Sequence, residues 1–176
     1  MGVFNRGNLI AAAIFLATMG LFSFAYYREA APSWLLKMTS AVAYSSSTVL
    51  HAMGRSTDVV AQPQVGSRLP SYTVYGGGAT LDIAIDCNGF WAFAIFIASV
   101  LAVPSTARAK LWGIALGVPA LWVINTIRIV SLYFVAIYVP SVFEEVHLYV
   151  WQFLIIASAF VLLMVWAEYF TQPADA

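Results

Sequence analysis

Four apolar runs divide the chain, and they cover residues 9–27, 88–104, 110–139 and 147–167. A helix rises ~1.5 Å per residue and the hydrocarbon core of a bilayer is ~30 Å thick, so ~20 apolar residues can cross it. We therefore predict an all-α integral membrane protein with four transmembrane helices. Pro119 is expected to kink the third helix, and a short loop over 141–145 is expected to precede the fourth.

The first run could instead be a cleaved signal peptide. The apolar core of a signal peptide is only ~7–15 residues long and is followed by a small-x-small cleavage site. Residues 9–27 carry no charge and end in Ala25-Tyr26-Tyr27. These features favour an uncleaved first helix.

Two segments between the first and second runs have other patterns. Over 33–54, apolar residues such as Leu35, Val42, Val49 and Met53 recur at helical spacing among serines, which predicts an amphipathic helix on the membrane surface or on the other helices. Residues 58–86 are extended, and Gly76-Gly77-Gly78 predicts a hairpin turn. We expect a small sheet of two or three strands outside the bilayer, since free sheet edges are not stable in lipid. The whole chain is predicted to form a single membrane domain.

Composition supports a membrane protein and excludes several functions. Of 176 residues, 62% are hydrophobic and 9% are charged, whereas soluble domains carry about 25% charged residues. The formal charge is zero, which gives no basis for binding nucleic acid. A single cysteine cannot form an internal disulfide, run a dithiol redox cycle or build a multi-thiolate zinc site. We expect no metal and no cofactor, and the oligomeric state is left open.

The charged loops predict an orientation. Arg108 and Lys110 lie between the second and third runs, whereas Glu144 and Glu145 lie between the third and fourth. The positive-inside rule then places Arg108, Lys110 and both termini in the cytoplasm. The segment over 33–86 is expected on the outer face.

Three rare side chains fall at the same predicted depth. Cys87 precedes the second run and His147 precedes the fourth, both on the outer side. Arg128 follows Lys110 by 18 residues, which is ~27 Å of helix and places it in the outer leaflet. Each has an ordinary interpretation: an inert cysteine, an interfacial histidine and a snorkelling arginine. However, an arginine inside a spanning run costs at least ~2.5 kcal/mol, and Asn125 one turn earlier favours an inward-facing site.

Together the three side chains suit acyl transfer. A thiolate can attack a peptide carbonyl, a histidine can protonate the leaving amine, and an arginine can stabilise negative charge. The start of a helix next to Asn88 and Gly89 would favour the Cys87 thiolate. Two other functions are possible: a non-enzymatic membrane scaffold or assembly subunit, and a small transporter that binds an anion at Arg128.

These motifs resemble those of the exosortase/archaeosortase family, and of its short exosortase H type in particular. The resemblance covers about half of the chain, roughly Leu81 to Trp166, and is carried by Cys87-Asn88-Gly89, Asn125-x-x-Arg128 and His147. Similar text surrounds them at 110–117, 125–132 and 147–152.

The resemblance implies a membrane-embedded cysteine protease or transpeptidase in the bacterial cytoplasmic (inner) membrane. Cys87 would be the nucleophile, Arg128 the catalytic arginine and His147 the proton carrier. Asn88, Gly89, Asn125 and Trp151 would support the site or bind substrate. The implied partners are exported proteins with a C-terminal sorting signal, which consists of a short motif of the IPTL kind, a transmembrane helix and a basic tail.

Overall fold

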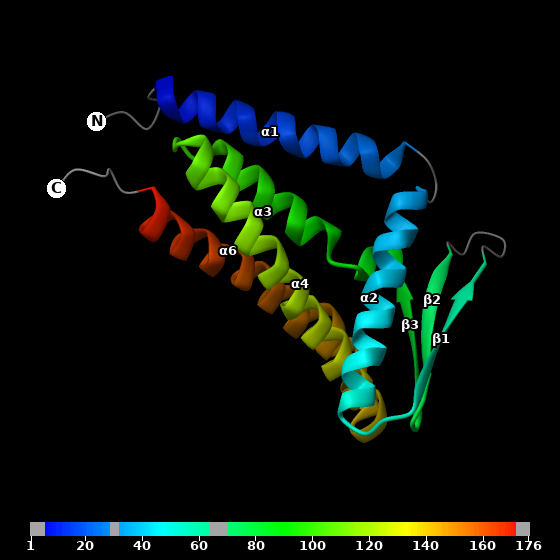
Figure 1. Cartoon of the computed structure of the whole chain (residues 1–176). Helices are drawn as coiled ribbons and strands as arrows, with labels where there is room; N and C mark the ends of the chain where they lie inside the picture. Colours follow the sequence, from blue (N-terminus) through cyan, green and yellow to red (C-terminus); the bar gives the residue numbers. More distant parts are fainter. Residues whose placement is uncertain (1–5, 29–31, 64–69, 172–176) are drawn as a thin grey trace.

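The computed structural model describes residues 6–28, 32–63 and 70–171, and it is mostly helical with one small sheet (Figure 1). The long helices are α1 (Arg6–Tyr27), α2 (Ser33–Ala52), α3 (Phe90–Ala102), α4 (Ala107–Tyr138) and α6 (Trp151–Phe170). The strands are β1 (Thr57–Gln62), β2 (Ser71–Gly76) and β3 (Ala79–Ala84). Short elements complete the order: 3-10 turns η1 (Ile85–Cys87) and η2 (Pro140–Val142), helix α5 (Phe143–Glu145) and π-helical turn η3 (Val146–Val150).

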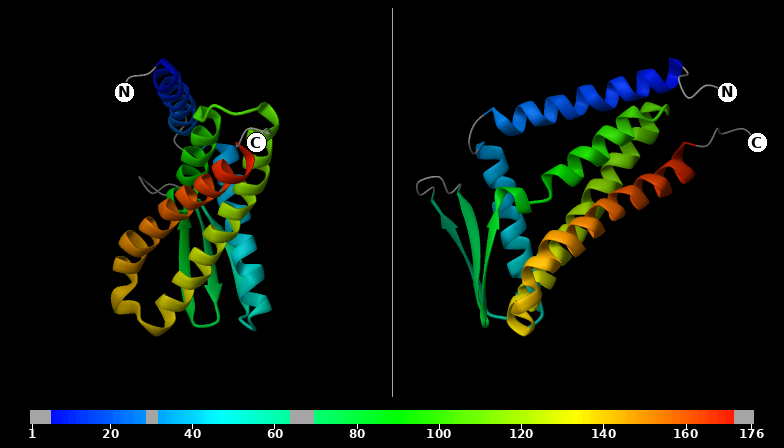
Figure 2. Two further views of the ribbon diagram at one scale, coloured as in Figure 1. Left: turned by 90° about the vertical axis from the view of Figure 1, so that its left-hand side faces the viewer. Right: turned by 180° about the vertical axis from the view of Figure 1, so that it is seen from behind.

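The helices form a bundle with the sheet at one end. Helix α3 packs against α1, α4 and α6, and α4 packs against α6. The start of α1, the α3–α4 connection and the end of α6 lie at one end of the molecule, whereas α2 and the sheet lie at the other (Figures 1 and 2). This arrangement is compatible with a multi-pass membrane protein.

Three helical segments of the described chain are long and apolar enough to cross a membrane: α1, α4 and the continuous segment Pro140–Phe170. The predicted second span corresponds to α3, which has 13 residues. At ~1.5 Å per residue it is ~20 Å long, which is shorter than the ~30 Å hydrocarbon core. The prediction of four spans is therefore not confirmed.

Two predicted helix ends differ from the structure. The third run was predicted to start at residue 110, whereas helix α4 begins at Ala107. There the Thr106 side chain accepts a hydrogen bond from the Ala109 amide at 3.2 Å and caps the first turn. The predicted loop over 141–145 is wrong, because the chain is helical there and onward to Phe170. Pro140 provides the reason, since proline is well suited to the first position of a helix.

The sheet is a three-stranded antiparallel meander in the order β1-β2-β3, which confirms the predicted hairpin. Gly76, Gly77 and Gly78 all have positive φ, so the tight turn between β2 and β3 requires glycine. The Tyr133 hydroxyl of α4 donates to the Gly76 carbonyl at 2.6 Å. Residues 64–69 of the predicted extended segment lie outside the described residues.

Helix α2 packs one face against the sheet and α4, and its other residues are exposed or half-buried. Val42, Ala43 and Leu50 join Val74 and Ile83 of the sheet in one core cluster, to which α4 contributes Ile129, Leu132 and Tyr133. The predicted apolar face is buried at Leu35 and Val42, but the second half of the helix differs. There Val49 and Met53 are 40% and 56% exposed, whereas Ser46 and Ser47 are buried.

Two glycines one turn apart allow close helix packing on α4. Gly113 lies against Trp166, whose indole N–H donates to the Ala109 carbonyl at 2.8 Å. Gly117 lies against the ring of Phe96, which is 1% exposed. Small residues at such positions let transmembrane helices approach closely.

The variant Gly117→Ala should therefore destabilise the protein. Its Cβ would overlap the Phe96 ring, and overpacking of a buried site costs about 1–3 kcal/mol. We expect a lower midpoint of thermal unfolding in detergent. Gly20→Ala is the matched control, because a Cβ at Gly20 in α1 meets nothing within 4 Å. Equal midpoints for both variants would contradict this packing.

Candidate active site

The structure brings Cys87 and His147 together. The Cys87 Sγ atom lies 3.6 Å from His147 Nε2, which is within hydrogen-bonding reach for sulfur. Cys87 ends the 3-10 turn η1 that follows strand β3. His147 lies in the π-helical turn η3, where its ring centroid is 5.7 Å from that of Phe143. Residues 60 positions apart in the chain are thus paired.

Arg128 is buried beside this pair. Its side chain is 5% exposed, and its Nε atom has no hydrogen-bond partner among the described residues. Its positive charge interacts electrostatically with both Cys87 and His147. Of the three side chains predicted at one depth, Cys87 and His147 approach each other directly, and Arg128 acts on both through its charge.

Cys87 favours the thiol form over the thiolate. Burial raises the pKa of its thiol, and this effect exceeds the opposite effect of the Arg128 charge. The negative charge of Asp86 raises the pKa further. The sequence predicted that the N-terminus of a helix would stabilise the Cys87 thiolate. In the structure Cys87 ends a separate turn and α3 starts only at Phe90, so burial has the larger effect on the thiol pKa. A base is therefore needed to activate the sulfur, and His147 Nε2 is in place to act as one.

The turn that carries Cys87 is held by Gly89 and Asn125. Gly89 has a φ of 84°, and a Cβ there would lie 3.0 Å from Asn125 Cγ. Asn125 Nδ2 donates to the Asn88 carbonyl at 3.1 Å. Of the residues predicted to support the site, Asn88, Gly89 and Asn125 thus lie close together.

Asn88 is fully buried and has a partner that the sequence did not suggest. Its Oδ1 accepts from the Phe90 amide at 2.9 Å, and its Nδ2 donates to Thr39 Oγ1 of α2 at 3.1 Å. Thr39 lies four residues after Leu35 and three before Val42, so it shares their buried face. This helical spacing from Leu35 and Val42 is the sequence feature from which the burial of Thr39 could have been predicted.

Other polar residues lie around the site. The Tyr26 hydroxyl of α1 donates to Asp86 Oδ1, which links α1 to the Cys87 turn. Trp151 is half-buried against the cluster formed by α2, the sheet and α4, and its predicted role in substrate binding stays a prediction. His51 and Asp82 are exposed.

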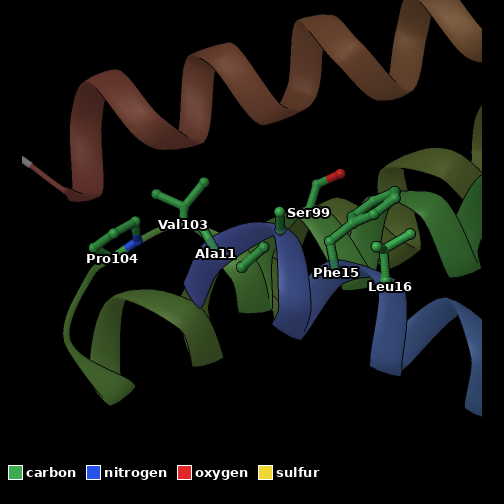
Figure 3. Close-up of a pocket in the computed structure, with 8 residues that line it drawn as sticks. Ala11, Phe15, Leu16, Ser99, Val103 and Pro104 are labelled. Carbon is green, nitrogen blue, oxygen red and sulfur yellow. The ribbon is translucent and has the colours of Figure 1, made fainter. Parts of the chain in front are cut away.

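The described residues contain no group of three or more His, Cys, Asp or Glu side chains that could hold a metal ion. Apolar grooves lie along α3. One of about 490 Å³ lies between α1 and the end of α3. Figure 3 shows residues that line it. Another of about 130 Å³ lies between α3 and α6. Neither of these two is lined by Cys87, Arg128 or His147. The predicted outward-facing cavity that holds all three stays a prediction.

Comparison with known proteins found no match. No family model, no curated protein and no solved structure matches this chain. Function must therefore be argued from the geometry and from the sequence resemblance.

The charges around Cys87 predict how its reactivity depends on pH. Asp86→Asn removes a charge that raises the thiol pKa, so more thiolate forms at a given pH and alkylation should be severalfold faster. Arg128→Gln removes a charge that lowers the pKa, so alkylation should be slower. The rate of alkylation of Cys87 by a maleimide, measured from pH 6 to about pH 10, checks both directions.

Asp58→Asn is the control, because Asp58 lies on β1, the strand farthest from β3 in the sheet. Its alkylation profile should equal that of the unmodified chain. A profile that is the same for Asp86→Asn, Arg128→Gln and Asp58→Asn would contradict the electrostatic arrangement.

Proposed function

We propose that this chain is a membrane-embedded cysteine protease or transpeptidase that cleaves the C-terminal sorting signal of exported proteins. The observation that supports this most is the 3.6 Å approach of Cys87 Sγ to His147 Nε2 beside the buried Arg128. A nucleophile, a proton carrier and a fixed cation are the groups that acyl transfer needs.

In the first half-reaction, His147 Nε2 takes the proton of the Cys87 thiol as the sulfur attacks the scissile carbonyl carbon. The tetrahedral intermediate carries a negative oxygen, which the Arg128 guanidinium stabilises. Arginine cannot act as a base in proteins, so its contribution is electrostatic. The carbon–nitrogen bond then breaks, His147 gives the proton to the leaving amine, and a thioester remains on Cys87.

In the second half-reaction, water or an amine attacks the thioester carbonyl. His147 accepts the proton of this nucleophile, the carbon–sulfur bond breaks, and the proton returns to the Cys87 sulfur. Water yields a free carboxylic acid, and an amine yields a new amide. The thiol is thereby regenerated, and no cofactor is consumed in either case.

The substrate class comes from the resemblance to exosortases. The short motif of the sorting signal would reach Cys87, and the transmembrane helix that follows it would lie beside α3 and α6. The apolar groove between these helices, lined in part by Ala92, Ser99 and Ala159, supports this placement. The groove lies between α3, which follows Cys87 in the chain, and α6, which follows His147.

We further propose that the chain resides in the bacterial inner membrane with its site on the periplasmic face. Arg108 and Lys110 lie at the end of the bundle opposite the sheet, where α4 begins. By the positive-inside rule this end is cytoplasmic, and so are the start of α1 and the end of α6.

Substitution of any of the three residues should abolish cleavage. We expect Cys87→Ala, His147→Ala and Arg128→Ala each to lower the rate by at least ~10²-fold, since each removes one step of acyl transfer. The measurement is C-terminal shortening of a co-expressed tagged protein that ends in an IPTL-type sorting signal. Arg128→Lys should retain only part of the activity, because it keeps the charge without the planar guanidinium.

His51→Ala and Arg108→Ala are the matched controls, as an exposed histidine and an exposed arginine outside the site. Both should cleave normally. Cleavage that continues in folded Cys87→Ala protein would contradict a cysteine mechanism. A chain that transports an anion without shortening any protein would instead indicate a transporter, and assembly that tolerates Cys87→Ala would indicate a scaffold.

A further inference from the structure

The position of Cys87 depends on its neighbour Asn88, which is 0% exposed. Buried amides must find hydrogen-bond partners inside the protein, because an unpaired polar group is costly away from water. Asn88 has three such contacts, and they come from three different helices. The Phe90 amide belongs to α3, Asn125 to α4 and Thr39 to α2.

Thr39 is oriented to accept the hydrogen bond from Asn88. Its own hydroxyl donates to the Leu35 carbonyl at 2.9 Å, one turn earlier in α2. The hydroxyl proton is therefore used within the helix, and an oxygen lone pair is left for Asn88 Nδ2 at 3.1 Å. Thr39 is also 0% exposed, so water cannot replace either partner.

We propose that Thr39 is a positioning residue for Cys87, which acts through the Asn88 side chain to keep the sulfur facing His147. Thr39 and Asn125 hold Asn88 from opposite ends, one at the side chain and the other at the carbonyl. Cys87 directly precedes Asn88, which caps the end of its turn, so a movement of Asn88 moves the turn that carries the sulfur. The effect of Thr39 on turnover rests on the proposed function, but its effect on the position of Cys87 does not.

Removing the Thr39 hydroxyl leaves Asn88 Nδ2 without its acceptor in a dry environment. Asn88 can then satisfy Nδ2 only by turning, and this displaces Cys87 from His147 Nε2 and from the Arg128 charge. A displacement of ~1 Å can cost ~10²-fold in rate when a reacting group is involved. Binding of substrate elsewhere on the protein is unaffected.

The test uses the purified full chain in detergent with three variants. Thr39→Val has nearly the same shape but no hydroxyl, and Thr39→Ser keeps the hydroxyl. Ser46→Ala is the matched control, because Ser46 is also 0% exposed in α2 but donates only to the Val42 carbonyl of its own helix. If Thr39→Val does not yield folded protein, Thr39→Ala takes its place.

Two readouts are made, and the first needs no substrate. The rate of maleimide alkylation of Cys87 against pH should shift to higher pH in Thr39→Val, since the sulfur loses its approach to His147 and Arg128. The second readout is cleavage of a sorting-signal substrate. There kcat should fall by ~10–100-fold with little change in KM, as is typical when an outer partner of an active-site group is lost. Thr39→Ser should restore both values, and Ser46→Ala should leave both unchanged.

An unchanged alkylation profile in Thr39→Val would overturn the proposal, and so would equal losses in Thr39→Val and Ser46→Ala. The failure of the proposed function has a different signature. In that case the unmodified chain cleaves no substrate, while the alkylation profiles of the three variants still decide whether Thr39 positions Cys87.

Discussion

The complete burial of Asn88 is the constraint on which the site depends. With no access to solvent, its side chain and carbonyl must be paired inside the protein, and the pairs come from α2, α3 and α4. One residue thus joins three helices at the point where the chain leaves the sheet and enters the bundle. The neighbouring Cys87 takes its place from this junction, and His147 reaches it from the segment that leads into α6.

The same junction depends on a polar helix face that is buried, which is that of α2. Several of its serines and threonines donate to carbonyls of their own helix, as Ser46 does with Val42 and Thr39 with Leu35. A polar face of this kind can be buried without loss of hydrogen bonds. The helix can therefore lie between the sheet and α4 and offer a hydroxyl to Asn88.

Burial also shapes the chemistry. Partial burial makes a thiolate costly, so the pKa of Cys87 is raised although the Arg128 charge acts in the opposite direction. The protein keeps an arginine charge beside a neutral thiol and a histidine. In the proposed mechanism, charge appears on the sulfur only when His147 takes the proton, and the Arg128 cation then stabilises it.

Much of this arrangement could be predicted from the sequence, and the misses have physical causes. The uncharged run over 9–27 and the three glycines at 76–78 correctly predicted a helix and a hairpin. Counting helix rise placed Cys87, Arg128 and His147 at one depth, but depth says nothing of position around the bundle. The buried face of α2 was predicted correctly at Leu35 and Val42 but not at Val49 and Met53, because buried serines look like solvent-facing residues in a sequence pattern. The contact of Thr39 with Asn88 joins residues 49 positions apart, and no local pattern predicts it.

The central claim is that Cys87 forms a covalent acyl intermediate. The most direct measurement is mass spectrometry of the protein after a short incubation with a sorting-signal substrate and a quench in acid. The proposal predicts a thioester that joins Cys87 to the new carboxyl end of the substrate, that hydroxylamine releases and that is absent from Cys87→Ala. Cleavage of the substrate without any adduct on Cys87, or with equal yield in Cys87→Ala, would contradict it.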